Sequence, residues 1–576
     1  MNEATRPAAL DNLSLLLAGE AGSGIQTIEE ILTQAFRRAG FHVFANKEYM
    51  SRIRGGSNST LIRIGSIPVR AWTNRPDLAI PLSRPALDHL RKRIPQDTLL
   101  LGEQEVIGRS EKAIPIPLAT AAKDIGGVLY VNTIAAGAVW GLFNQPVELL
   151  ELAVKSYFQG KTPEVLENNR QAVRIGYAIG AGVRQTKQFF QNFPLAPEAA
   201  PAYFLSGAQA VGLGAIAGGC NFVSAYPMSP STGVLTFLAQ RAREFGLVVE
   251  QAEDEISAAN MVLGAWYAGA RGLTTTSGGG FDLMTEAVSL SGMIETPMVV
   301  HLAQRPGPAT GLPTRTEQGD LNLALYGGHG EFPRALLAPG NLEQAFSLTR
   351  KAFSMADELQ IPVFVLTDQY TMDSMCDVAG FDLSSIPDSS RIVRTEPDYR
   401  RYLLTNDGIS PRGIPGHGTG LVFVDSDEHD ERGNITEAAE VRRQMVEKRL
   451  HKGELAKAMA LPPEWIGPAQ ADNLVICWGS TLEPLREAVT RLERPDLAIL
   501  HFPQVYPVAP QARDLLAKAR RLILVEGNST GQFGKLLQME LGAAWAFRIL
   551  KYEGLPFAVE ELQAELAERL HKEVRP

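Results

Sequence analysis

The length, composition and charge of this chain exclude several classes of protein. Its 576 residues are too many for one hydrophobic core, so the length predicts about three or four domains. The net charge of −9 argues against nucleic acid or an anionic membrane as the main partner. No apolar run approaches the roughly 18 residues of a membrane span, and the polar N-terminal residues argue against a secretory signal.

The cysteines are few and widely spaced. Cys220, Cys376 and Cys477 never form a Cys-x-x-Cys pair, which excludes an iron–sulfur cluster or structural zinc held by thiolates of this chain alone. The spacing fits a reducing cytoplasm with free, buried thiols. We therefore expect a cytoplasmic protein that holds no metal of its own.

In chain order, the first predicted unit is an α/β domain over residues 12–190. A strand at 13–18 is followed by Gly19-Glu-Ala-Gly-Ser-Gly24, a helix at 25–39 and a strand at 41–45. The glycines can bring backbone N–H groups close to a phosphate at the N-terminus of the helix. Their spacing is neither the dinucleotide fingerprint nor a Walker loop, so a tight turn without a ligand is the alternative.

The rest of this unit carries fewer signals. Arg52 and the segment Arg54-Gly-Gly56 can add cations for a phosphorylated ligand, or they are solvated surface. Residues 132–183 have a largely helical pattern. The proline-rich segment 193–201 predicts a domain boundary.

A second α/β unit is predicted over residues 204–378. Short β-branched runs alternate there with helical patterns, and the predicted strands are 221–225, 247–251, 272–276, 298–303 and 362–367. This alternation predicts a mainly parallel, doubly wound sheet, whose ligands lie at the carboxyl ends of its strands. Residues 380–465 have an irregular pattern, and a third α/β unit begins at residue 473 and includes a strand at 522–525.

Polar clusters follow the strands of the second unit. They are Ser224-Ala-Tyr-Pro-Met-Ser-Pro-Ser-Thr-Gly233, Glu253-Asp-Glu255, Thr274-Thr-Thr-Ser-Gly-Gly-Gly-Phe281 and the segment from Arg305 to Leu321. Arg305 and Arg315 stand among glycines and prolines. This suggests a rigid loop that holds carboxylates, because a guanidinium group matches a carboxylate bidentately. For the acidic run, the helix macrodipole is a sufficient alternative explanation.

Two further observations limit the chemistry. Asp407, Glu428, His429 and Asp430 can ligate a metal, but their charged setting favours a solvated loop. Thiamine enzymes bind the diphosphate of their cofactor through Mg²⁺ with a Gly-Asp-Gly stretch and a downstream Asn. No Gly-Asp-Gly occurs in this chain.

Together, these motifs are similar to those of the α subunit of 2-oxoacid:ferredoxin oxidoreductases, most closely the 2-oxoglutarate type. The resemblance covers nearly the full length. Its signatures are Tyr226-Pro-Met-Ser-Pro-Ser-Thr232, Glu253-Asp-Glu255 with Ala258-Ala259, and the segment from Arg305 to Asp320. Ser229 stands where many relatives carry Thr, and Ala309 stands where Ser is common. The first of these differences can alter substrate contacts.

The resemblance implies a multidomain α/β fold with four parts. A γ-type domain associated with CoA is expected at 1–192, and a pyrimidine-binding, doubly wound parallel sheet at 203–378. An irregular connecting region is expected at 379–468, followed by a transketolase C-terminal-like α/β domain at 469–576.

The resemblance also implies chemistry shared with a β subunit. Thiamine diphosphate would be bound by both subunits, with Mg²⁺ and a [4Fe–4S] cluster on the β subunit, in agreement with the missing Gly-Asp-Gly and Cys-x-x-Cys motifs. The reaction would convert a 2-oxoacid, CoA and oxidised ferredoxin into acyl-CoA, CO₂ and reduced ferredoxin, reversibly. A dimer of αβ heterodimers is expected, without nucleic acid or membrane partners.

Specific roles follow from the same resemblance. Glu255 is expected to be the catalytic carboxylate, hydrogen-bonded to N1′ of the cofactor's aminopyrimidine. Tyr226 and Pro227 are expected to bind the cofactor. The expected substrate-binding residues are Ser229, Thr232, Arg305 and Arg315, and the expected CoA-binding residues are Gly22, Gly24, Arg54, Gly55 and Gly56. The alternative for Arg315 is a structural role in which it pairs with Glu317 or Asp320.

Three alternatives remain open. The substrate can be pyruvate or another 2-oxoacid. The chain can instead be a non-catalytic binding or scaffold paralogue, although the presence of Glu255, Arg305 and Arg315 together argues against that. It can also be a dehydrogenase component that feeds a lipoyl carrier, which the fused γ-like domain disfavours. The physiological direction of the reaction stays open.

Overall fold

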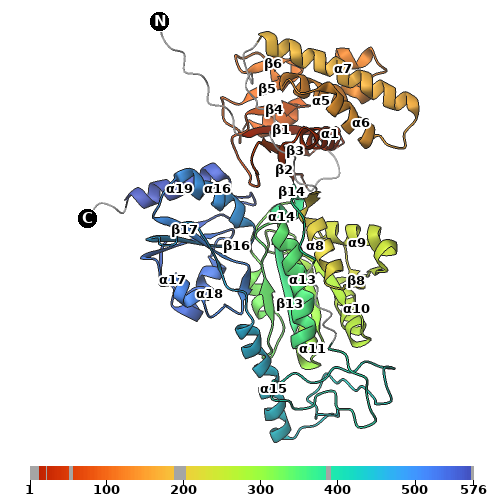
Figure 1. The fold of residues 1–576 in the computed structure, drawn as a ribbon, viewed down its shortest axis with the longest axis vertical. Coiled ribbons are helices and arrows are strands. Elements are labelled where there is room, and N and C mark those ends of the chain that lie inside the picture. The colour runs from red at the N-terminus through yellow and green to blue at the C-terminus, as the bar shows by residue number, and fades with distance from the viewer. Residues whose placement is uncertain are drawn as a thin grey trace. The chain divides into compact units, whose positions relative to one another are not determined.

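The computed structural model describes residues 12–20, 22–50, 56–91, 93–186, 203–383 and 391–572. The chain forms two compact units, each assembled from several segments of the sequence. The first comprises Met1–Phe204, Ser374–Gly380 and Ala558–Glu560, and the second comprises Leu205–Asp373, Phe381–Phe557 and Glu561–Pro576. Figure 1 labels their helices and strands.

The first unit is organised around an eight-stranded sheet in the order β6-β5-β4-β1-β3-β2-β14-β7. Every residue of β1 (Asn12–Glu20) except its two ends is buried, which explains why this leucine-rich run forms a central strand. The predicted strands at 13–18 and 41–45 are confirmed. The other strands are β2 (His42–Glu48), β3 (Ser57–Gly65), β4 (Leu78–Pro81), β5 (Leu99–Gly102), β6 (Ala113–Pro115), β7 (Tyr203–Ser206) and β14 (Ser374–Val378).

The helices of the first unit confirm the predicted helix at 25–39 and the helical region at 132–183. They are α1 (Ile25–Arg38), α2 (Arg84–Leu90), α3 (Gln104–Ile107), α4 (Leu118–Lys123), η1 (Val128–Tyr130), α5 (Val131–Leu142), α6 (Val147–Tyr157) and α7 (Pro163–Thr186). The backbones of α5 and α7 approach closely, because a Cβ atom added at Gly176 would lie 2.1 Å from the carbonyl oxygen of Ile134. The predicted linker at 193–201 lies outside the described residues.

The second unit contains a seven-stranded sheet in the order β18-β12-β13-β11-β10-β8-β9. All of its neighbours pair in parallel except β12 and β18. The five predicted strands are confirmed. The strands are β8 (Phe222–Ala225), β9 (Val248–Gln251), β10 (Gly272–Thr276), β11 (Met298–Gln304), β12 (Ala335–Leu337), β13 (Pro362–Asp368) and β18 (Gln504–Tyr506).

Helices connect these strands, as the alternating pattern predicts. They are α8 (Gly207–Ala217), α9 (Thr232–Phe245), α10 (Glu255–Tyr267), α11 (Gly278–Met293), α12 (Leu321–Tyr326), α13 (Leu342–Leu359) and α14 (Gln369–Asp373). The start of α8 is fixed by a capping box between Ser206 and Gln209. Strands β11 and β13 at the centre of the sheet are buried along their full length.

A five-stranded sheet in the order β15-β17-β16-β19-β20 forms the C-terminal part of the second unit. Its strands are β15 (Glu464–Ile466), β16 (Asn473–Trp478), β17 (Leu497–Phe502), β19 (Arg521–Glu526) and β20 (Trp545–Leu550). The accompanying helices are η2 (Gly479–Thr481), α16 (Leu482–Leu492), α17 (Ala512–Leu516), α18 (Gln532–Leu541) and α19 (Val559–Lys572). Among the described residues, no helix combines the length and the hydrophobicity that crossing a membrane requires.

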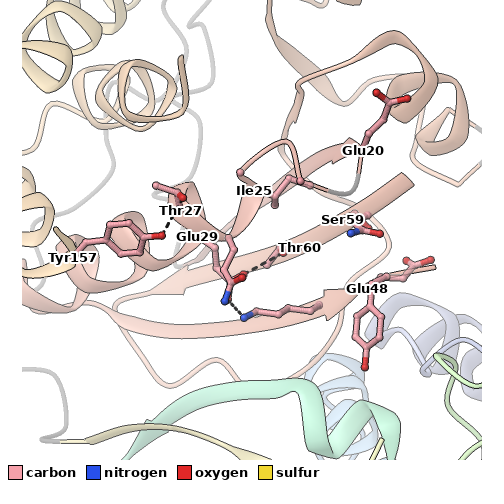
Figure 2. Close-up of a pocket in the computed structure, with 14 residues that line it drawn as sticks. Glu20, Ile25, Thr27, Glu29, Glu48, Ser59, Thr60 and Tyr157 are labelled. Carbon is pink, nitrogen blue, oxygen red and sulfur yellow. Dashed lines mark hydrogen bonds and ion pairs between the residues drawn. The ribbon is translucent and has the colours of Figure 1, made fainter. Parts of the chain in front are cut away.

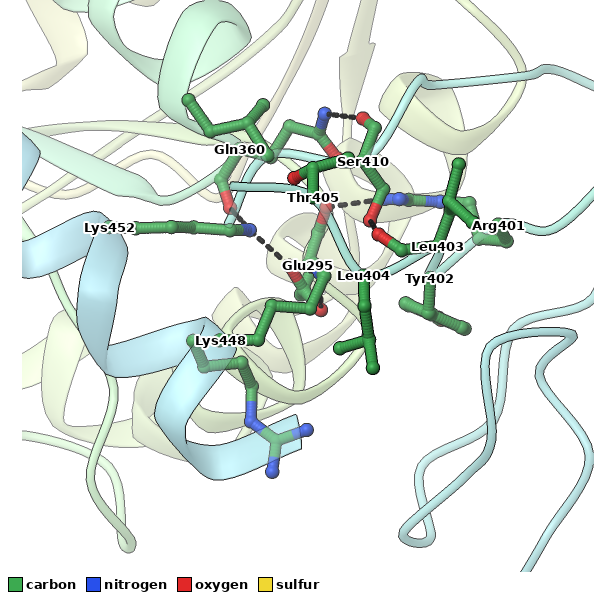
Figure 3. A network of polar contacts seen from close by, with 12 residues as sticks. Glu295, Gln360, Arg401, Tyr402, Leu403, Leu404, Thr405, Ser410, Lys448 and Lys452 are labelled. Carbon is green, nitrogen blue, oxygen red and sulfur yellow. Dashed lines mark hydrogen bonds and ion pairs between the residues drawn. The ribbon is translucent and has the colours of Figure 1, made fainter. Parts of the chain in front are cut away.

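The prediction of an irregular region at 379–468 is wrong for α15 (Ala439–Ala458), a helix of 20 residues. Its buried face carries Lys448, Arg449 and Lys452 in place of an apolar stripe, so the sequence shows no amphipathic pattern. Both lysines bind the carboxylate of Glu295, which directly follows α11, and Lys448 does so at 2.6 Å (Figure 3). Burial of this helix therefore depends on charge pairing.

One strand lies outside the domain to which its sequence position assigned it. β14 falls within the expected 203–378 range, yet it pairs antiparallel with β2 in the sheet of the first unit. Asp377 at its end accepts hydrogen bonds from Arg37 Nε and from the Val43 N–H, both at 2.7 Å. These contacts anchor the strand in that sheet.

Candidate active site

The polar clusters predicted for the second unit lie at one edge of its sheet. The turn from Tyr226 to Thr232 follows β8, the glycine turn at 277–280 follows β10, and Arg305 follows β11. These three strands are neighbours in the order β11-β10-β8 and run parallel, so their carboxyl ends meet, as expected of a ligand site in such a sheet.

Glu255 is the first residue of α10 and is only 4% exposed. The preceding Asp254 caps the helix by accepting the Ser257 N–H at 2.7 Å, whereas Glu253 is exposed. The Oε1 atom of Glu255 is buried and has no hydrogen-bond partner in the part of the chain that the structure describes. A buried carboxylate oxygen without a partner is costly, so this atom is suited to a ligand that donates a hydrogen bond.

The glycine turn lies directly against Glu255. A Cβ atom added at Gly280 would lie 2.7 Å from Glu255 Oε1 and 2.2 Å from Thr276 Oγ1. The Oγ atom of Ser277, at the N-terminus of α11, is also buried without a partner among the described side chains. The turn therefore leaves room for the carboxylate and adds a second unsatisfied polar atom beside it.

Arg305 and Ser229, both predicted to bind substrate, are in contact. Arg305 Nη1 donates to the backbone carbonyl of Ser229 at 2.8 Å. Within the described ranges its Nε is buried and has no acceptor. Burial lowers the pKa of Arg305, and the nearby charge of Asp320 opposes that shift. Thr232 begins α9, directly after the same turn.

Asp320 closes the Arg305–Asp320 signature and was expected only as an alternative partner of Arg315, yet its charge acts on Arg305. Its backbone N–H donates to Gln304 Oε1 at 3.0 Å. A Cβ atom added at Gly278 would lie 2.5 Å from each of its carboxyl oxygens. The presence of a carboxylate so close to Arg305 could have been inferred from the motif, but its position against the glycine turn could not.

Arg315 lies at the other end of the same loop. Its Cβ and Cγ atoms would be 3.0 and 3.3 Å from a Cβ atom at Gly554. The next residue, Thr316, donates its N–H to the carbonyl of Gly554 at 3.2 Å. The two arginines therefore begin and end a loop that runs from the seven-stranded sheet to the C-terminal part of the unit.

Gln318 fixes this loop to the C-terminal part. Its side chain donates to the carbonyl of Trp478 at 2.8 Å and accepts the N–H of Gly527 at 2.7 Å. Its backbone N–H donates to the Gly527 carbonyl at 2.7 Å. Since Gln318 lies between Arg315 and Asp320, these bonds restrict the positions that both residues can take.

Two of the glycines predicted to bind CoA, Gly22 and Gly24, line a cavity of about 400 Å³ in the first unit (Figure 2). Gly24 caps α1 in the left-handed conformation with φ 81°, which favours glycine. Gly56 is not among the lining residues, and Arg54 and Gly55 lie outside the described residues. The lining residues are Glu20, Gly22, Gly24, Ile25, Gln26, Thr27, Glu29, Lys47, Glu48, Tyr49, Asn58, Ser59, Thr60 and Tyr157.

Among the described residues that line this cavity, carboxylates outnumber cations. Glu29 accepts from Thr60 Oγ1 at 3.3 Å and pairs with Lys47 at 3.2 Å, as Figure 2 shows. Burial raises the pKa of Glu29, with Lys47 acting in the opposite direction. Glu20 adds a further carboxylate, whereas Glu48 is paired with Arg93 at 2.6 Å. The lining thus suits an uncharged, hydrogen-bonding ligand segment better than a phosphate.

The acidic segment considered as a metal site or solvated loop has a structural role in the fold. Glu428 binds Arg449 through two hydrogen bonds of 3.0 and 2.9 Å. The buried ring of His429 lies 3.8 Å from that of Tyr402. Asp430 accepts the N–H groups of two residues of its own turn. No group of three His, Cys, Asp or Glu side chains suited to a metal occurs among the described residues.

The cysteines match their prediction, since Cys220, Cys376 and Cys477 are all buried and none forms a disulfide bond.

Comparison with known proteins agrees with this geometry. The family model described as "Pyruvate ferredoxin/flavodoxin oxidoreductase" matches residues 14–179. The model described as "Pyruvate flavodoxin/ferredoxin oxidoreductase, thiamine diP-bdg" matches residues 213–448. Together with the fold and the site, these matches define an oxidoreductase subunit with a thiamine diphosphate-binding domain.

Similarity over the whole chain narrows this class. Subunit alpha of 2-oxoacid:ferredoxin oxidoreductase 2 from Aeropyrum pernix is 30% identical, over 95% of this chain and 96% of its own length. The 2-oxoglutarate oxidoreductase subunit KorA of Mycobacterium tuberculosis is 26% identical, over 97% and 92%. The chain belongs to the family of 2-oxoacid:ferredoxin oxidoreductase α subunits.

A solved structure is similar over the same extent. It is the 2-oxoglutarate:ferredoxin oxidoreductase from Magnetococcus marinus with 2-oxoglutarate, coenzyme A and succinyl-CoA bound. The match has a TM-score of 0.91 and 31% identity, and it covers 97% of this chain and 100% of the other. The family assignment therefore rests on sequence and fold together.

Proposed function

We propose that this chain is the α subunit of a 2-oxoglutarate:ferredoxin oxidoreductase. The enzyme interconverts 2-oxoglutarate, CoA and oxidised ferredoxin with succinyl-CoA, CO₂ and reduced ferredoxin. The observation that carries the proposal is the buried Glu255, whose Oε1 lacks a partner among the described residues at the ligand edge of the sheet. The relatives that act on 2-oxoglutarate support the choice of substrate.

The residues present fit thiamine diphosphate as the cofactor. Bound at this edge, it supplies a nucleophilic carbon and an electron sink for decarboxylation. Glu255 Oε1 is the acceptor for N1′ of the aminopyrimidine, where the carboxylate holds a proton between its oxygen and the ring nitrogen. Tyr226, which is 40% exposed, and Pro227 line the cofactor from the turn after β8.

The two carboxylates of 2-oxoglutarate are assigned to the two ends of the arginine loop. Arg305, with Ser229 and Thr232, binds the C1 carboxylate beside the reacting carbonyl group. Arg305 Nη1 already bonds the Ser229 carbonyl, and its buried Nε, which has no partner among the described residues, is one of the donors that remain for the substrate. Arg315 binds the distal carboxylate.

CoA is the ligand proposed for the N-terminal cavity, and Arg54, Gly55 and Gly56 remain further proposed CoA-binding residues. Because Glu20, Glu29 and Glu48 line this cavity, the pantetheine arm rather than a phosphate is the part that fits there. Gln26 lies exposed at its lining. Gln26→Trp should raise the KM for CoA while leaving the KM for 2-oxoglutarate unchanged. Gln159→Trp, an exposed change away from the lining, serves as the control.

A β subunit is the proposed partner, and it provides Mg²⁺ and a [4Fe–4S] cluster in a dimer of αβ heterodimers, with ferredoxin as the electron carrier. This arrangement accounts for the three scattered cysteines and for the missing Gly-Asp-Gly. Because this chain lacks both the cluster ligands and the diphosphate motif, a second chain is required for the complete reaction.

The test of the proposed function is a substrate panel. The chain is co-purified with its β subunit and assayed with CoA, ferredoxin and each of 2-oxoglutarate, pyruvate and 2-oxobutyrate. We expect kcat/KM to be highest for 2-oxoglutarate. A preference for pyruvate, the substrate in the names of both matching family models, would replace the substrate assignment.

A further inference from the structure

The carboxyl group of Asp320 occupies a confined position between the N-terminus of α11 and Arg305. A Cβ atom at Gly278, the first residue of α11, would lie 2.5 Å from both of its oxygens. The backbone N–H of Asp320 donates to Gln304 Oε1, and Gln304 directly precedes Arg305 in β11. Asp320 is thus held from one side by a helix end and from the other by the strand that carries Arg305.

The Oδ2 atom of Asp320 is buried, and it has no hydrogen-bond partner in the described ranges of the chain. A buried anionic oxygen without a donor is unfavourable, and it would be relieved by protonation or by a ligand. Arg305 Nε is in the same state. Two unsatisfied groups of opposite charge therefore face the site where a carboxylate substrate is proposed to bind.

The charges around Asp320 act in opposite directions. Burial, and then the negative charge of Glu317, raise the pKa of Asp320 to about 7, whereas Arg305 acts to lower it. The positive end of the α11 dipole also favours the anion. Glu255 packs against Gly280, which lies two residues after Gly278 in the same turn. A small change in nearby charge is therefore sufficient to change the protonation of Asp320 near neutral pH.

We propose that Asp320 is a positioning residue for Arg305 and takes up one proton from solvent when a 2-oxoacid carboxylate binds to that arginine. The inference rests on the proposed function, because it requires the substrate carboxylate at Arg305. In the free protein the Asp320 anion partly balances the guanidinium. When the substrate carboxylate binds, it balances the charge of Arg305 in place of Asp320. Protonation of Asp320 then removes the repulsion between its carboxylate and that of the substrate.

Proton uptake on binding fixes the sign of the pH dependence. Below about pH 7 Asp320 is already protonated in the free protein, so binding of the 2-oxoacid is independent of pH. Above that pH each binding event must take a proton from solvent, and the KM for the 2-oxoacid rises, approaching about tenfold per pH unit. The carboxylates of the substrate do not titrate in this range.

The experiment measures KM and kcat for 2-oxoglutarate from pH 6 to 9 at saturating CoA, with the αβ complex. The wild type should show a flat KM at low pH and the alkaline rise. Asp320→Asn should remove the rise and keep KM nearly constant. Glu317→Gln removes a charge that raises the pKa of Asp320, so its rise should begin at a lower pH.

The outcomes separate this inference from the proposed function. An Asp320→Asn complex that keeps the wild-type alkaline rise overturns the inference, even if its kcat falls. Should that variant fail to assemble, a wild-type profile in Glu317→Gln overturns it equally. A wild-type complex that oxidises no 2-oxoacid would instead contradict the proposed function. A purely structural role for Asp320 would not move the onset of the rise in Glu317→Gln.

Discussion

Gly280 lies so close to Glu255 that a methyl group added at this glycine would overlap the carboxylate, at 2.7 Å from Oε1 and 2.8 Å from Cγ. Gly280→Ala should therefore displace Glu255 and lower kcat at least tenfold, with a loss of stability on the order of 1–3 kcal/mol from overpacking. Gly279→Ala is the matched control. Its Cβ atom would meet only the Ala309 carbonyl, at an ordinary distance of 3.6 Å, and we expect nearly wild-type turnover.

Removing the charge of Glu255 tests its role without changing its shape. Glu255→Gln should fold and assemble with the β subunit normally, yet lose turnover by about 10²–10⁴-fold, as is typical when a positioned acid–base group is removed. Glu253→Gln, two residues away and exposed, should retain full activity. Nearly wild-type turnover of Glu255→Gln would remove this residue from the proposed contact with N1′.

The two arginines are distinguished by substrate selectivity. Arg305→Ala should impair every 2-oxoacid, because all of them carry the C1 carboxylate. Arg315→Ala should impair 2-oxoglutarate far more than 2-oxobutyrate. Leaving a substrate carboxylate buried without its partner costs on the order of 2–5 kcal/mol. The deciding quantity is the ratio of kcat/KM for 2-oxoglutarate over 2-oxobutyrate. An unchanged ratio in Arg315→Ala would show that this arginine does not bind the distal carboxylate.

The Glu295 cluster should control stability. Burial acts to raise the pKa of Glu295, but Lys452, Lys448 and Arg401 together lower it below its usual range. Its contribution is therefore present above the unfolded pKa of about 4.5 and lost as the pH falls below that value. Burial also lowers the pKa of Lys452 to about 7, against the effect of Glu295. Between about pH 7 and 10.5, Lys452 is protonated in the unfolded chain but neutral in the folded one. The free energy of unfolding should therefore increase as the pH rises through this range.

Glu295→Gln removes the anion that the buried side chains of Lys448 and Lys452 both bind. The free energy of unfolding should fall by about 3–5 kcal/mol, measured by denaturant titration at pH 7. Arg443→Ala breaks an exposed pair with Glu440 on the same helix and should change stability little. A similar stability for Glu295→Gln and the wild type would mean that water or a rearranged neighbour satisfies the two lysines.

The need for a second chain can be tested with the purified α subunit alone. We expect no iron–sulfur absorbance and negligible affinity for thiamine diphosphate, because the diphosphate and cluster motifs are missing. Titration of the purified chain with thiamine diphosphate by calorimetry provides the measurement. Stoichiometric binding would contradict the proposed division of the site between two subunits.

Local patterns predicted the strands of the second unit because its parallel sheet is built from short β-branched runs, such as β10. The same reasoning, that the carboxyl ends of parallel strands meet at one edge of a sheet, predicted Glu255 and Arg305 at that edge. It missed α15 because Lys448 and Lys452 are buried by pairing with a residue more than 150 positions away, which leaves no periodic signal. The position of Asp320 against the glycine turn was missed for a related reason, since Gly278 lies more than 40 positions away in the sequence.

β14 has a practical consequence for dissecting this protein. The strand lies at the end of the 203–378 segment, yet it belongs to a sheet whose other members come mostly from the first 115 residues. A truncation that starts near residue 203 would therefore strip Ser374–Val378 of its partner β2 and leave an exposed strand edge, which invites aggregation. Because segments that are distant in the sequence share one sheet, point substitutions should identify the roles of single residues more clearly than domain deletions.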